Sequence, residues 1–111
     1  MLEKRKRKRA SVAYYLEVFE GETKKLLGRL INITPEGLML ESREPIETSK
    51  AFQLSMNLPG SLFGNSKISL EARSIWCRKD SQLQHYKAGF QLQNLDTQVE
   101  KKIQRLIEKL K

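Results

Sequence analysis

The sequence predicts a mainly β domain that ends in one amphipathic helix, and three observations support this prediction. Apolar residues recur at every second position in six short segments separated by turn-forming residues. The last segment changes to helical spacing. At 111 residues the chain can bury one core but is too short for two. Six strands and one closing helix favour a compact antiparallel barrel or sandwich over an α/β fold.

The expected strands are set by this alternation and by the turns between them. They lie within residues 12–19, 26–33, 38–40, 51–58, 68–77 and 88–92. The second and third form a hairpin, because Pro35 and Gly37 suit the turn that joins them. In the fifth strand the apolar phase shifts along its length, which indicates a β-bulge near Arg73 or Ser74. A long, bulged strand of this kind suits a barrel.

The C-terminal segment is expected to be an amphipathic helix that packs on one end of the barrel or pairs two chains. Thr97 and Glu100 have the spacing of a capping box at its start. Its apolar stripe consists of Val99, Ile103, Leu106, Ile107 and Leu110. The predicted organisation is therefore a flexible basic arm over residues 1–10, a β-barrel over 11–95 and the helix over 96–111.

Charge is concentrated in the arm. The formal net charge is +8, and the first ten residues carry six bases against one acid, a net +5. The remaining 101 residues are therefore nearly balanced, at +3. A domain with so little net charge outside the arm does not resemble a protein that coats long nucleic acid with an extended basic face. The excess charge points instead to a local anion-binding role for the arm, or to a solvated basic tail.

Other residues narrow the class of function. Cys77 is the only cysteine, which excludes an internal disulfide and a cysteine metal cluster and fits a reducing cytoplasm. Apolar runs stay well short of the roughly 20 residues of a membrane helix, so we expect a cytoplasmic protein. His85 is the one histidine and has no evident catalytic partner. The acidic residues Glu41, Glu44 and Glu47 are interpreted as solvated charge. We therefore expect no enzymatic activity, metal or cofactor.

Two short motifs are candidates for ligand binding. Arg5 and Arg9 lie four residues apart, and their guanidinium groups can hold phosphate bidentately or pair with guanine acceptors. Asn32 and Thr34 place polar side chains at the end of a strand, with Gly37 after the turn. They could bond a ligand edge, or they could simply cap the turn.

Together the two motifs resemble those of the PilZ domain family, whose signature is Arg-x-x-x-Arg on an N-terminal arm followed by Asp/Asn-x-Ser-x-x-Gly. Arg5, Arg9, Asn32 and Gly37 match this signature, while Thr34 stands where the family usually has serine. The resemblance spans essentially the whole chain, in order and with suitable spacing. It implies a six-stranded PilZ-like β-barrel that binds the bacterial second messenger cyclic di-GMP.

The same resemblance implies how the site is built. Arg5 and Arg9 would contact guanine and phosphate, and the rim opposite would consist of Asn32, Thr34 and Gly37. The weaker candidates are Lys4, Lys8 and Trp76; of these, Trp76 could stack on a base or fill the core.

Closure of the arm over the nucleotide would then signal to a downstream protein, in a motility, biofilm or secretion system, from a monomer or homodimer. The alternatives are a barrel that binds single-stranded nucleic acid and an adaptor that does not bind nucleotide.

Overall fold

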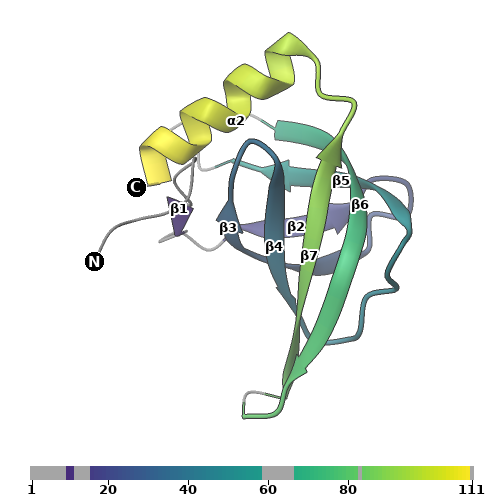
Figure 1. Ribbon diagram of the computed structural model, residues 1–111. Coiled ribbons are helices and arrows are strands. Elements are labelled where there is room, and N and C mark those ends of the chain that lie inside the picture. The colour runs from purple at the N-terminus through teal and green to yellow at the C-terminus, as the bar shows by residue number, and fades with distance from the viewer. Residues whose placement is uncertain (1–9, 12–15, 59–66, 83, 111) are drawn as a thin grey trace.

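The structure is a computed structural model that describes residues 10–11, 16–58, 67–82 and 84–110. Within these residues seven strands and one helix form in a single antiparallel arrangement (Figure 1). The strands are β1 (Ala10–Ser11), β2 (Glu17–Glu20), β3 (Leu26–Ile33), β4 (Gly37–Ser42), β5 (Ala51–Asn57), β6 (Lys67–Asp80) and β7 (His85–Gln93). The helix is α2 (Thr97–Leu110).

Six of these strands close into a barrel. Neighbours follow the order β3, β2, β5, β6, β7 and β4, and β4 pairs back onto β3 to complete the circle. The prediction of a six-stranded antiparallel barrel with one C-terminal helix is therefore confirmed. The described part of the expected first strand is β2, and residues 12–15 of that prediction lie outside the described residues.

The two-residue strand β1 was not anticipated from the sequence. Ala10 pairs with Ile33 and Ser11 with Asn32. Because Asn32 and Ile33 pair with β4 on one edge of β3, β1 must lie on the other edge, the one that β2 also occupies. The chain thus enters the barrel beside the end of β3.

Alternate residues of each strand fill the interior, as the period of two requires. Leu30, Leu40, Leu54 and Leu70 are all at most 2% exposed. In β6 the register shifts between Ser74 and Trp76, next to the position at which the phase change predicted a bulge. The bulge lets Ser74 point inward while Ile75 and Trp76 both lie on the outer face, in one groove.

Helix α2 lies across one end of the barrel, and the β6–β7 hairpin projects beyond the other end (Figure 1). Ile103, Leu106 and Ile107 are buried against the barrel, which confirms their predicted orientation. The predicted capping box is wrong by one residue: the backbone N–H of Val99 donates to the Asp96 carboxylate at 2.8 Å, so Asp96 is the N-cap. No helix among the described residues is long and apolar enough to cross a membrane.

Candidate functional site

Four outward-facing residues form a continuous row across the barrel surface. Asn32 on β3 pairs with Met39 on β4, Met39 pairs with Gly89 on β7, and Gly89 pairs with Trp76 on β6. This row lies in a groove of about 790 Å³. The groove is also lined by Ile75, Phe90, Gln91, Leu92 and residues 34–38.

Trp76 forms the β6 side of this groove. Its indole ring lies against Gly89, where a Cβ atom would overlap the Nε1 and Cε2 atoms of the ring. The guanidinium carbon of Arg78 lies 5.0 Å from the ring centroid. The sequence left open whether Trp76 fills the core or faces a ligand. The structure places it on the outer face, whereas Phe90 is buried in the core at 4% exposure.

The turn after β3 forms one end of the groove, and Thr34 holds it together. The Thr34 hydroxyl accepts the backbone N–H groups of Glu36 at 3.2 Å and Gly37 at 3.1 Å, and it lies 3.3 Å from the Gly37 carbonyl, to which it can donate. These bonds occupy the hydroxyl, so in this structure Thr34 caps its own turn.

Gly37 and Glu36 tie this turn to β7. A Cβ atom at position 37 would meet the carbonyl oxygen of Phe90, so only glycine allows β4 to approach β7 here. The Glu36 carbonyl accepts the backbone N–H of Leu92 at 2.9 Å. Gly37 therefore has a structural reason for its identity that is independent of any ligand.

Asn32 contributes the polar side chain in the centre of the groove. The structure shows no hydrogen bond from its side-chain amide to any of the residues described. The amide carries both donors and acceptors, so it can bond a ligand edge at this position.

The remaining predicted site residues, Lys4, Arg5, Lys8 and Arg9, lie outside the described residues.

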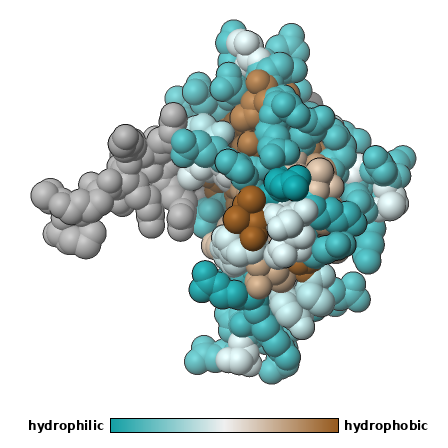
Figure 2. Space-filling model, turned by 45° about the vertical axis from the view of Figure 1, so that its right-hand side comes forward, coloured by the Kyte–Doolittle hydropathy of each residue, from teal (hydrophilic) through white to brown (hydrophobic). Residues whose placement is uncertain are grey.

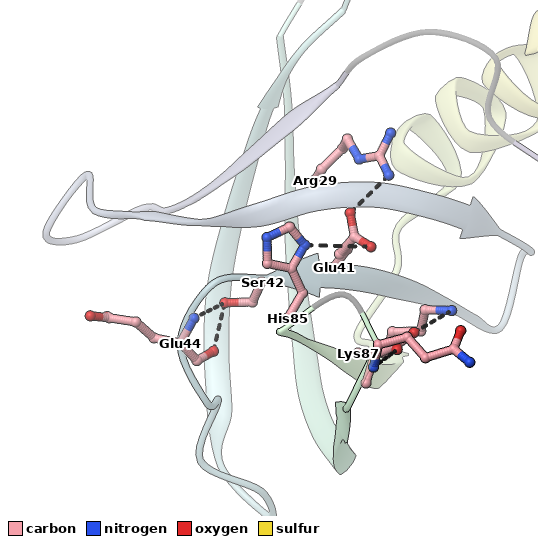
Figure 3. A network of polar contacts seen from close by, with 8 residues as sticks. Arg29, Glu41, Ser42, Glu44, His85 and Lys87 are labelled. Atoms are coloured by element: carbon pink, nitrogen blue, oxygen red, sulfur yellow. Dashed lines mark hydrogen bonds and ion pairs between the residues drawn. The ribbon is translucent and has the colours of Figure 1, made fainter.

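A second polar cluster occupies the neighbouring row of the same surface (Figure 3). Arg29 donates to Glu41 at 2.8 Å, and the His85 Nδ1 atom lies 3.9 Å from the other Glu41 oxygen. The Glu41 side chain is only 13% exposed, so its interpretation as freely solvated charge is wrong. Lys87, which pairs with Glu41 across the strands, forms its own ion pair with Asp80 at 3.8 Å. The cluster joins β3, β4 and β7 at the border of the groove.

Several residues that line the groove were not identified from the sequence. Met39, Gly89 and Gln91 belong to alternating strands, where their outward position alone carries no functional signal. Ile75 is 50% exposed, although its branched side chain is typical of a core residue. Figure 2 shows that the hydrophobic surface on this side of the molecule is divided into separate areas among hydrophilic and nearly neutral residues. No three histidine, cysteine or acidic residues of the described chain come together as metal ligands.

Comparison with known proteins places this barrel in a family of small β-barrel domains. The PilZ domain model matches residues 3–109, and the chain belongs to the PilZ domain family. A search of curated protein sequences finds no significant match.

Three similar solved structures show the extent of the likeness. The PilZ domain of YcgR from Escherichia coli, solved with c-di-GMP, superposes with a TM-score of 0.74 at 18% identity, over 97% of this chain and 92% of that one. MotI/DgrA of Bacillus subtilis, an inhibitor of motility, gives 0.76 at 14% identity over 97% and 51%. MrkH of K. pneumonia, in a c-di-GMP complex, gives 0.74 at 11% over 99% and 53%. The chain thus spans about half the length of the last two.

Proposed function

We propose that this PilZ domain is a receptor for cyclic di-GMP, which binds in the groove between the turn 34–37 and Trp76 while Arg5 and Arg9 close over it. Membership of the family and the c-di-GMP complexes of similar domains support this choice of ligand. In this proposal the groove binds the nucleotide without reacting with it. The basic arm supplies the positive charge that a dianionic nucleotide requires.

The observation that carries the proposal is the register of β1. Ser11 pairs with Asn32, which lies in the groove, and Ala10 pairs with Ile33. Arg9 is bonded directly to Ala10, so the arm begins at the rim of the groove. Arg5 is four residues further on, a span of at most about 14 Å for an extended chain. Both arginines can therefore reach a ligand that lies between Asn32 and Trp76.

The groove offers complementary contacts for a guanine nucleotide. The indole of Trp76 presents a flat face on which a base can stack. The Asn32 amide can bond a polar edge of the ligand. Thr34 and Gly37 contribute through the shape of their turn, because the Thr34 hydroxyl is already occupied by the backbone. Lys4 and Lys8 would add charge around the phosphates.

Closure of the arm would convert binding into a signal. An arm that lies over the groove changes the charge and shape of the surface around β3 and β4, which a downstream protein can recognise. We expect this exchange in the cytoplasm, with the domain acting as a monomer or homodimer. The charge-assisted contacts of two arginines also predict that affinity falls as salt is added.

Isothermal titration with cyclic di-GMP tests the proposal. We expect the full chain to bind, and Arg5→Ala and Arg9→Ala each to lose at least about tenfold in affinity, since a hydrogen bond to a charged group contributes about 1.5–3 kcal/mol. Arg7→Ala is the matched control, because it removes the same charge from the arm outside the Arg-x-x-x-Arg spacing.

Equal losses in all three variants would indicate that the arm acts through bulk charge rather than through Arg5 and Arg9. Absence of binding by the parent protein, together with salt-sensitive binding to single-stranded oligonucleotides, would overturn the proposal in favour of nucleic-acid binding.

A further inference from the structure

Arg78 lies over the indole ring of Trp76, on which a base would stack. Gly89 closes one face of the indole, since a side chain there would overlap the ring. The Arg78 guanidinium lies over the same ring, 5.0 Å from its centroid. A guanidinium at this distance from the ring centroid borders the ring surface that a base would use. A base that stacks on Trp76 must therefore meet Arg78.

The hydrogen-bond donors of Arg78 are not used by the described residues. Two carboxylates on the neighbouring strand positions pair with other cations: Glu41 bonds Arg29 at 2.8 Å, and Asp80 lies 3.8 Å from Lys87. Among the described residues Arg78 makes a ring contact but no ion pair or hydrogen bond. An arginine carries five donors in a planar fork. Within the described part of the chain, the contact of this fork is with the indole.

Room for the side chain to move is present on the outer surface. A second hollow of about 420 Å³ adjoins the groove, and Trp76 and Arg78 both line it, with Lys79 and Lys87. Arg78 lies two residues beyond Trp76 on β6, about 6.6 Å along a strand. A rotation about its side-chain torsions can therefore move the guanidinium from the ring face to the edge of a base that lies on the ring.

We propose that Arg78 is a specificity residue that reads the guanine edge of a base stacked on Trp76. Guanine presents two acceptors, O6 and N7, to such a fork, whereas adenine presents a donor beside its N7 acceptor. Trp76 stacks on either base, because every base has a π face. Trp76 thus supplies affinity and Arg78 supplies discrimination. This inference rests on the proposed binding of cyclic di-GMP in the groove.

Titration of cyclic di-GMP and cyclic di-AMP into the full chain tests this assignment, with Trp76 fluorescence as a second readout because it is the only tryptophan. We expect Arg78→Ala to reduce affinity for cyclic di-GMP by at least about fivefold and to leave that for cyclic di-AMP within about twofold. Arg78→Lys keeps the charge but loses the fork, so it should behave like Arg78→Ala. Arg105→Ala, an exposed arginine on α2, is the control and should change neither.

The outcomes separate this inference from the function on which it rests. If the parent binds cyclic di-GMP and Arg78→Ala weakens both dinucleotides equally, Arg78 acts as charge or packing and the assignment is wrong. An Arg78→Lys protein that binds cyclic di-GMP as tightly as the parent would also overturn the assignment, because lysine keeps the charge but not the fork. Failure of the parent protein to bind cyclic di-GMP would overturn the proposed function and this inference together.

Discussion

The indole of Trp76 on β6 rests against the backbone of Gly89 on β7, in the space that a side chain at position 89 would need. This relationship explains how a tryptophan can lie flat on the outside of a barrel. The glycine removes the Cβ that would push the ring away, and the adjacent bulge in β6 turns Trp76 outward. The aromatic wall of the groove therefore depends on a residue that has no side chain.

Gly89→Ala should displace the indole and weaken ligand binding. The new methyl group would overlap the ring, so either the ring moves or β7 shifts, at about 1–3 kcal/mol of unfolding free energy. We expect a changed tryptophan emission spectrum and weaker titration with cyclic di-GMP. Gly21→Ala is the matched control, because its Cβ would overlap no atom: the nearest is in the flexible Gln53 side chain at 3.2 Å, and the Gln53 carbonyl oxygen follows at 3.4 Å. Unchanged emission and affinity in Gly89→Ala would show that the ring is not held by this contact.

Ser74 links the loop after β4 to the bulge that positions Trp76. Its buried hydroxyl lies 2.6 Å from the Glu47 carbonyl, to which it donates, and it accepts the Lys50 N–H at 3.2 Å. Ser74→Ala leaves both groups without this partner, which should lower the free energy of unfolding by about 1–3 kcal/mol. Urea denaturation measures this loss.

The control for Ser74 lies on the same strand. Ser69 is exposed on the outer face of β6, so Ser69→Ala should stay within about 0.5 kcal/mol of the parent protein. Faster hydrogen exchange at the Lys50 amide in Ser74→Ala alone would locate the effect in the loop. Equal stability of the two variants would contradict the role assigned to the Ser74 hydroxyl.

The fold was largely predictable from the sequence because the alternation of apolar residues is a local signal. Leu54, Met56 and Leu70 are buried where the period of two placed them, and the phase change in β6 located the bulge to within a residue or two. The capping of α2 was less predictable. Asp96 and Thr97 are both good N-cap residues, and only the backbone geometry selects Asp96.

The candidate site was predictable only in part, because it is assembled by register between distant strands. Asn32 and Trp76 are 44 positions apart in the chain and meet in one row only through Met39 and Gly89. Nothing local in the sequence distinguishes Met39 and Gly89 from other outward positions. The strand β1 was likewise missed, since two residues are too few to show a period.

Thr34 should stabilise its turn through its hydroxyl rather than through its methyl group. Thr34→Val removes the acceptor for two backbone N–H groups and should lower the free energy of unfolding by about 1–2 kcal/mol. Thr34→Ser keeps the hydroxyl and should remain within about 0.5 kcal/mol of the parent. Thermal unfolding of the three proteins measures the difference. Equal stability of the valine and serine variants would show that the hydroxyl contributes nothing to the turn.

Docking of α2 should also support the base of the arm, because the helix lies beside β1 as well as β6 (Figure 1). Leu106 is fully buried beneath the helix, and Leu106→Ala should cost about 2–5 kcal/mol of unfolding free energy through the cavity that it leaves. At temperatures where the Leu106→Ala protein is still folded, we also expect weaker binding of cyclic di-GMP. A helix that packs less tightly on the barrel leaves β1 less firmly placed next to Asn32. Lys101→Ala, on the exposed face of α2, is the control for both measurements. A Leu106→Ala protein that is destabilised but binds with unchanged affinity at a temperature where it is folded would separate the helix from the ligand site.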